Sequence, residues 1–221
     1  MITACYSSNP GSVYDLSELK ISGINFTENK GQIIDGNHNL RPDILYVGDG
    51  GGMKVYLRKS GISYVLSKTT AKKDEEKVLN ERTGMENEIQ QITNIHLHRI
   101  DLDFVDCNSN ITILRDNEAQ GYSNYYYGHC PKGITNVHSY NRVVYQNVFP
   151  NIDFVFYGGK KEGLKYDIIV KPGGDPNNIK LKYSGADELE ITNGELKIKN
   201  SIAEITENIP CLLYTSPSPR D

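Results

Sequence analysis

Three aspartates lie along one predicted strand, close enough for their carboxylates to act together in catalysis or metal binding. Asp101 and Asp103 lie two residues apart in HRIDLDFVD, so on a strand their side chains share a face, roughly 7 Å apart. With Asp106 nearby, such a pair could serve as the acid and base of a hydrolase or bind calcium. The same alternation arises on any solvated strand, and Arg99 offers an ion-pair partner on that face. We therefore expect a structural role and assign no catalytic residue.

Two histidines with the same spacing raise the question of a metal site. His96 and His98 would point the same way on a strand, and His129 or Asp101 could complete a ligand set. No third ligand has a diagnostic spacing, so we predict no metal and no cofactor. The sequence also lacks a G-x-S-x-G nucleophile motif, and Gly50–Gly52 is not followed by the Gly-Lys-Ser/Thr of a phosphate loop. These observations favour a protein that is not an enzyme.

Three consecutive tyrosines, Tyr125, Tyr126 and Tyr127, are the best binding candidates. Strand alternation exposes at least one of these rings, and exposed aromatic rings stack on sugars or partner proteins. In the alternative interpretation, two rings lie in the core and the third lies on an ordinary surface. The first interpretation predicts a carbohydrate- or surface-binding site, and the second leaves the tyrosines structural.

Cysteines suggest two modifications. Cys5 ends the tetrapeptide ITAC, which has the pattern of a bacterial lipoprotein cleavage box. If the true start lay upstream, Cys5 would be lipidated; a chance match in a fragment is the alternative. Cys107 and Cys130 could form a disulfide in an oxidising compartment, with two free thiols as the alternative.

The last residues, 211–221, read CLLYTSPSPRD and break abruptly with the preceding pattern. One back-translation of this tail looks like a transposase end joined to a sequencing adaptor. We therefore interpret 211–221 as an artefact and not as natural protein, with a Pro/Ser linker as the alternative.

Composition limits the class of protein. The chain has 221 residues, of which 38% are hydrophobic and 24% charged, enough to bury a sizeable core. A net charge of -4 without a basic block argues against nucleic acid as a partner. No apolar run approaches the roughly 20 residues that span a bilayer, and no complete signal peptide is present.

Short apolar runs that end in Gly, Pro, Asn or Asp dominate the chain. Met53 to Arg58 and Ile62 to Ser67 flank a turn and predict a hairpin, and Asn193-Gly194 is a strong turn signal. Between 152 and 157, alternate residues are apolar and share one face. The sequence therefore predicts an all-β fold, an antiparallel β-sandwich of two packed sheets.

The expected domain organisation is simple. Residues 1–20 form a lead-in or tether, and 21–210 form a single domain. Within it, 68–93 is dense in charge and helix formers, so we expect an exposed insertion with a short helix.

Several motifs together resemble a known bacterial family. They are FTENKGQ, GGMKVYLRKSGISYVL, HRIDLDFVDCN, SNYYYGHCPKGITNV, VVYQNVFPNIDFVFYG and LKYDIIVKPGGDPNNIKLKYSGADEL. In this order they resemble the large N-terminal β domain of unknown function that precedes SBBP-type β-propeller repeats. That family occurs in secreted and cell-surface proteins and offers no catalytic residue to carry over.

The resemblance implies a secreted or cell-surface location, with downstream β-propeller repeats of the same chain as partners. We expect a non-catalytic structural or interaction module of an exported multi-domain protein. The alternatives are a carbohydrate- or surface-binding adhesin domain that uses the tyrosines, and a hydrolase that uses Asp101 and Asp103.

Overall fold

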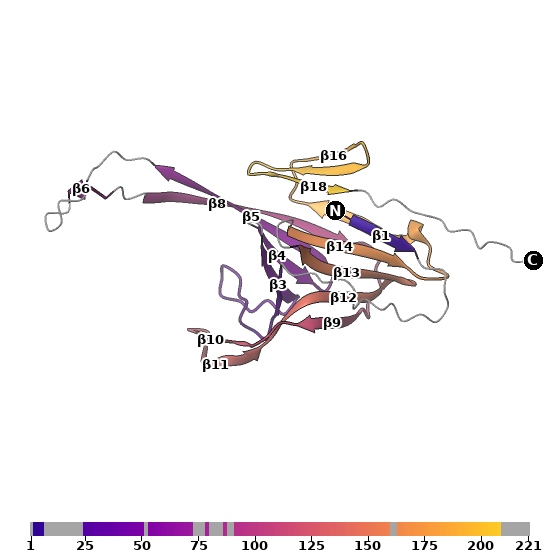
Figure 1. Ribbon diagram of the computed structural model, residues 1–221, viewed down its shortest axis with the longest axis horizontal. Helices are drawn as coiled ribbons and strands as arrows, with labels where there is room; N and C mark the ends of the chain where they lie inside the picture. The colour runs from indigo at the N-terminus through magenta and orange to yellow at the C-terminus, as the bar shows by residue number, and fades with distance from the viewer. Residues whose placement is uncertain are drawn as a thin grey trace, which may run out of the picture.

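The computed structural model describes residues 2–6, 24–50, 53–72, 78–79, 86–87, 91–159 and 163–208. These residues form strands joined by turns (Figure 1), which confirms the predicted all-β class. The tail 211–221 and most of the lead-in 1–20 lie outside the described residues. The elements are β1 (Ile2–Tyr6), β2 (Phe26–Glu28), β3 (Ile44–Gly50), β4 (Met53–Arg58), β5 (Gly61–Lys72), β6 (Val78–Leu79), β7 (Glu86–Asn87), β8 (Gln91–Phe104), β9 (Thr112–Glu118), β10 (Ser123–Tyr127), β11 (Cys130–Val137), β12 (Ser139–Phe149), β13 (Ile152–Gly159), β14 (Gly163–Val170), the 3-10 turn η2 (Pro176–Asn178), β15 (Leu181–Ser184), β16 (Glu188–Thr192), β17 (Glu195–Lys199) and β18 (Glu204–Asn208).

One large sheet of eleven strands organises the fold. Its strands follow the order β1-β14-β13-β12-β2-β3-β4-β5-β8-β15, and β9 pairs with β12 off this path. Because β9 and β13 pair with the same residues of β12, they lie on opposite edges of that strand. Neighbouring strands are antiparallel except for β1, which pairs with β14 in parallel.

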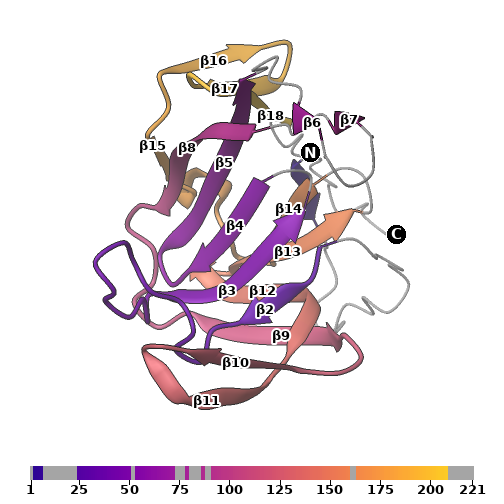
Figure 2. The same ribbon diagram turned by 90° about the vertical axis from the view of Figure 1, so that its left-hand side faces the viewer.

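The large sheet curls on itself, as Figure 2 shows. Phe104 lies on β8 and Phe154 on β13, with five strands between them in the sheet order, yet their ring centroids are 4.8 Å apart. The Tyr145 hydroxyl of β12 also donates a hydrogen bond to the carbonyl of Arg58 on β4, over 3.0 Å. The predicted sandwich of two packed sheets is not confirmed, because one bent sheet supplies both sides of this core.

The core is aromatic and well enclosed. Ile152, Phe154 and Phe156 of β13 are fully buried, which confirms the predicted inward row. Their neighbours on the opposite face, Asp153 and Val155, are 5% and 3% exposed. Both faces of β13 are therefore covered.

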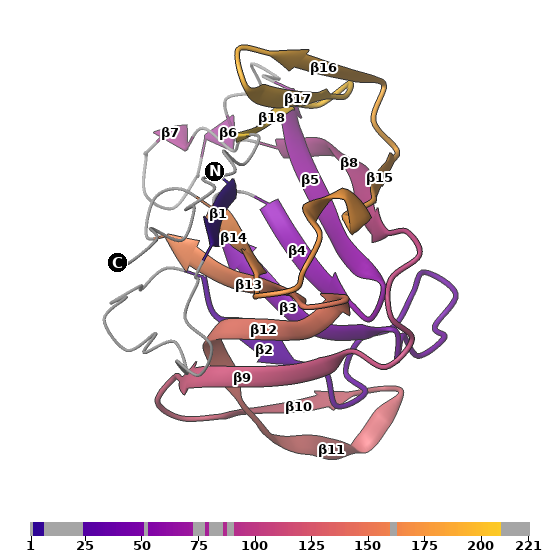
Figure 3. The same cartoon turned by 90° about the vertical axis from the view of Figure 1, so that its right-hand side faces the viewer.

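A three-stranded sheet of β16, β17 and β18 closes one end of the curl (Figure 3). Ile198 of β17 is fully buried against the main core. Glu207 of β18 is 5% exposed and accepts hydrogen bonds from the hydroxyls of Tyr64, Tyr166 and Tyr183, at 3.2, 3.1 and 2.5 Å. These tyrosines come from β5, β14 and β15, so one carboxylate joins the small sheet to three strands of the large one.

Two predicted turns are confirmed. β4 and β5 form the expected hairpin, with Arg58 opposite Gly61. Asn193 and Gly194 both have positive φ, 54° and 79°, and connect β16 to β17. Two successive positive φ values are the geometry that Asn-Gly favours in a two-residue hairpin.

The described residues between 68 and 93 form strands and no helix, so the prediction of a helix is wrong for them. β5 and β8 continue as paired strands from Gly61 opposite Asp103 to Lys72 opposite Gln91, and they extend away from the rest of the fold in Figure 1. Beyond them Val78–Leu79 pairs with Glu86–Asn87. Helix propensity is a weak preference that strand pairing can outweigh, and between 61–72 and 91–103 each strand completes the other's backbone hydrogen bonds.

The cysteines lie on separate elements. Cys107 follows β8 and packs partly buried against the core, whereas Cys130 begins β11, and both are free thiols. The structure therefore does not form the predicted disulfide. The backbone of Cys5, in β1, pairs with that of Ile169 in β14. The lipidation of Cys5 stays a prediction. Among the described residues, no helix is long and apolar enough to cross a membrane.

Candidate functional site

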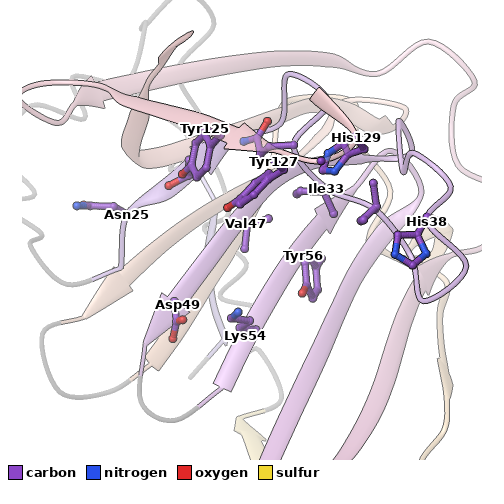
Figure 4. Close-up of a pocket in the computed structure, with 14 residues that line it drawn as sticks. Asn25, Ile33, His38, Val47, Asp49, Lys54, Tyr56, Tyr125, Tyr127 and His129 are labelled. Carbon is purple, nitrogen blue, oxygen red and sulfur yellow. The ribbon is translucent and has the colours of Figure 1, made fainter. Parts of the chain in front are cut away.

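A groove of about 950 Å³ lies between the outer face of the large sheet and the β10–β11 hairpin (Figure 4). The loop that connects β2 to β3 forms its remaining side. Its lining residues are Asn25, Thr27, Gln32, Ile33, Ile34, His38, Val47, Asp49, Lys54, Tyr56, Tyr125, Tyr127, Gly128 and His129.

Strand alternation builds the floor of the groove. Phe26, Tyr46 and Val55 point into the core from β2, β3 and β4. The next residue along each of these strands therefore points outward. Thr27 lies opposite Val47, which lies opposite Tyr56, giving a row across β2, β3 and β4. Two register pairs further along, and on the same face, Asp49 is the partner of Lys54. The floor therefore combines an apolar and aromatic row with a carboxylate and an ammonium group.

Aromatic rings line the hairpin side. Tyr125 and Tyr127 are two residues apart on β10, so both face the groove, and His129 follows in the turn (Figure 4). The ring centroids are 5.8 Å apart for Tyr125 and Tyr127, and 5.5 Å apart for Tyr127 and His129. The second pair is stacked, with 21° between the ring planes. We call Tyr125, Tyr127 and His129 the aromatic row.

Tyr126 points to the other face of the hairpin. A Cβ atom on Gly133 of β11 would lie 2.4 Å from the Tyr126 ring, so the ring packs directly on this glycine. Gly133 has a φ of 81°, where a side chain would also be strained. Of the three predicted binding tyrosines, the structure thus brings Tyr125 and Tyr127 into the groove and leaves Tyr126 on the opposite surface, 66% exposed.

Side-chain hydrogen bonds hold the loop between β2 and β3 in one conformation. The Asn29 amide donates to the carbonyls of Arg41 and Ile44, at 2.9 and 2.8 Å. Asp35 accepts from the backbone N–H groups of Asn39 and Asn37, at 2.9 and 2.8 Å. These bonds, the one from the Asn39 N–H above all, lower the pKa of Asp35. The FTENKGQ motif therefore serves to shape one wall of the groove.

Lys30 connects this loop to the hairpin. Its ammonium group donates to the carbonyl of Asn136 on β11 at 2.5 Å and lies 3.0 Å from the Glu28 carboxylate. Burial opposes ionisation of Glu28, but the N–H of His138 and the charge of Lys30 lower its pKa overall. The hydrogen bond thus joins the loop to the hairpin, and the ion pair holds Lys30 beside β2.

The two aspartates considered for catalysis, Asp101 and Asp103, form ion pairs with arginines. Arg58 is 9% exposed, and its guanidinium lies 2.6 Å from Asp103 and 3.6 Å from Asp101. Arg99 donates to Asp101 over 2.8 Å, as its position on the same strand face predicts. Burial raises the pKa of Asp101, yet hydrogen bonds from Arg99 and Ser63 lower it overall. These groups form an ion-pair network on β4, β5 and β8.

The histidines considered for metal binding are not brought together. The Nε2 atom of His98 lies 2.5 Å from the carbonyl oxygen of Gly185, whereas His129 belongs to the aromatic row. In the part of the chain that the structure describes, no group of three His, Cys, Asp or Glu side chains could hold a metal ion.

Sequence reasoning missed the floor of the groove. Val47, Asp49, Lys54 and Tyr56 come from strands far from the tyrosines in the chain, and only the folded sheet places them opposite the hairpin. The alternation of buried Val55 and Leu57 would have marked Tyr56 as outward-facing. It could not have shown which element covers that face.

No curated protein and no solved structure matches the chain. A family model described as a domain of unknown function, DUF7948, matches residues 26–216, which include every described strand from β2 to β18. The chain therefore belongs to the DUF7948 family of domains of unknown function.

Proposed function

We propose that the domain is a non-catalytic interaction module that binds carbohydrate in the groove under the β10–β11 hairpin. The observation that carries this proposal is the aromatic row, whose rings line one side of a groove with apolar and charged groups on its floor. Aromatic ring faces pack against the C–H faces of sugar rings, and neighbouring polar groups bind the hydroxyl groups. Asn25, Gln32, Asp49 and Lys54 offer both hydrogen-bond donors and acceptors there.

The chemistry of the lining supports binding without catalysis. Glycoside hydrolysis commonly uses two carboxyl groups on either side of the scissile bond. Among the described residues that line the groove, Asp49 is the sole carboxylate. Asp101 and Asp103 are engaged by Arg58 and Arg99.

The rigid construction of the site also favours binding. The loop after β2 is held by the Asn29 and Asp35 hydrogen bonds and is joined to the hairpin by Lys30. A site that is formed before the ligand arrives loses less conformational entropy on binding. This arrangement supports a surface that recognises a ligand of fixed shape.

The wider context of the proposal rests on the resemblance described above. We propose that the module belongs to an exported bacterial protein, located outside the cytoplasm and ahead of β-propeller repeats. In that setting, a glycan-binding domain would attach a multi-domain protein to a polysaccharide or a cell surface.

A glycan array tests the proposed function. Wild type should bind at least one class of glycan, and Tyr127→Ala should weaken that binding about tenfold because one stacking surface is lost. Tyr126→Ala is the matched control, since it removes the neighbouring ring from the opposite face of the hairpin. Absence of binding to every glycan, with the wild-type domain folded, would refute the proposal and favour a purely structural module.

A further inference from the structure

We propose that the groove binds an internal stretch of an extended, electrically neutral glycan, with two or more consecutive sugar units along the aromatic row. This inference rests on the proposed carbohydrate binding and specifies its ligand. Three properties of the groove carry it: the arrangement of the rings, the polar residues beyond the row, and the balance of charge in the lining.

The three rings follow one another along the hairpin side of the groove, and Tyr127 and His129 stack on each other. Tyr125, Tyr127 and His129 follow one another at alternate positions, and successive ring centroids are 5.8 and 5.5 Å apart. Successive ring planes differ by 36° and 21°, so the surface turns only gradually along the row. One sugar ring covers about one aromatic ring, so a single monosaccharide would leave most of the row uncovered. A chain of sugars would cover it.

The groove continues past both ends of the row. Figure 4 shows Asn25 and His38 on opposite sides of the three rings, and both residues are exposed. Their polar side chains can bind hydroxyl groups of further sugar units. A site for a chain end would instead close around the terminal sugar. This arrangement favours a glycan that passes through the groove.

The charges in the lining cancel. Asp49 and Lys54 are register partners on neighbouring strands, and they are the aspartate and the lysine of the lining. An acidic polysaccharide would therefore find no net positive charge to replace the water around its carboxylates. A neutral glycan loses no such hydration.

Oligosaccharides of increasing length test this inference. The probes are neutral glucose, mannose, galactose and N-acetylglucosamine oligomers, from monosaccharide to hexasaccharide, together with galacturonate oligomers, all measured by calorimetry. Affinity for a neutral series should rise at least tenfold from monosaccharide to tetrasaccharide and then level off. It should be insensitive to salt and to chemical blocking of either chain end.

Two results would overturn the inference while leaving carbohydrate binding intact. One is a monosaccharide that binds as tightly as the hexasaccharide, or loss of binding when a chain end is blocked. The other is a preference for galacturonate oligomers that weakens with salt. Failure of every probe, neutral and acidic, would instead contradict the proposed function itself.

Variants distinguish the aromatic row from its surroundings. Tyr125→Ala and Tyr127→Ala should each weaken hexasaccharide binding about tenfold, with a smaller effect on disaccharides that can shift to the remaining rings. Tyr126→Ala should leave both affinities unchanged. Val47→Trp adds bulk to the floor without removing a ring and should also weaken binding. Thermal unfolding of each variant checks the fold, and unchanged hexasaccharide affinity in folded Tyr125→Ala, Tyr127→Ala and Val47→Trp would overturn the proposal.

Discussion

Replacing Glu207 tests how the small sheet is attached to the large one. The Glu207 carboxylate is 5% exposed and accepts hydrogen bonds from three tyrosine hydroxyls. In Glu207→Leu the buried hydroxyls of Tyr64 and Tyr166 lose their acceptor, at a cost of about 1–3 kcal/mol each. Removing a desolvated carboxylate offsets part of that loss. We expect the free energy of unfolding to fall by about 3 kcal/mol.

The pH dependence of stability provides a second, independent test. Burial raises the pKa of Glu207 above its ordinary 4.5, although bonds from Tyr183, Tyr166 and Tyr64 oppose the rise. The folded state therefore holds the proton more tightly than the unfolded state. This contribution to stability is fully present below the unfolded pKa and is lost as pH rises through the folded pKa.

Glu207→Gln isolates this effect because glutamine keeps an acceptor of similar size but does not titrate. Relative to wild type, the variant should be least stable near about pH 4, and its deficit should shrink as pH rises towards about pH 8. Urea unfolding of both proteins at several pH values measures the difference. A deficit that grows with pH would refute the reasoning, since it would mean that the three tyrosines stabilise the ionised carboxylate more than burial destabilises it.

Three further predictions concern other parts of the fold. Gly158→Ala should lower the free energy of unfolding by about 2 kcal/mol or more, because the new Cβ would lie 2.4 Å from the Ile24 nitrogen. Gly36→Ala is the control, since nothing lies within 4 Å of its Cβ. Equal losses of stability in the two variants would contradict the close packing of Gly158 on Ile24. Arg58→Met should cost about 3 kcal/mol in urea unfolding because it leaves Asp101 and Asp103 without their buried partner, whereas breaking the more exposed Arg41–Asp43 pair should cost less than about 1 kcal/mol. Lys30→Met should speed amide hydrogen exchange in residues 29–43 while leaving β13 unchanged, and unaltered exchange there would show that Lys30 does not join the loop to the hairpin.

Much of the secondary structure could be predicted because each strand carries its own signal. The row of Ile152, Phe154 and Phe156 marks both the strand and its buried face, and Asn193-Gly194 marks a turn without reference to the rest of the chain. The arrangement of the strands is different. A curled sheet and a two-sheet sandwich bury the same alternate residues, so periodicity does not distinguish them.

The errors also have local causes. Residues 68–93 contain many good helix formers, but propensity contributes at most about 0.7 kcal/mol per ordinary residue. At the two ends of this range, 68–72 and 91–93, pairing between β5 and β8 decides the conformation. Only one side of the groove could be predicted from the sequence. Tyr125 and Tyr127 could be proposed from their spacing, whereas the floor depends on the register of β2, β3 and β4 and on the position of the hairpin above them.

Strands β3 and β4 contribute one face to the core and the other to the groove, and this affects how such a domain can diversify. On β3 and β4 the inward residues Tyr46, Val55 and Leu57 maintain the core, while the outward residues Val47 and Tyr56 line the groove. Mutations at the outward positions change the surface of the groove without changing the volume of the core. One scaffold can therefore acquire different groove surfaces over evolutionary time, with the stability of the core and the chemistry of the groove under separate selection.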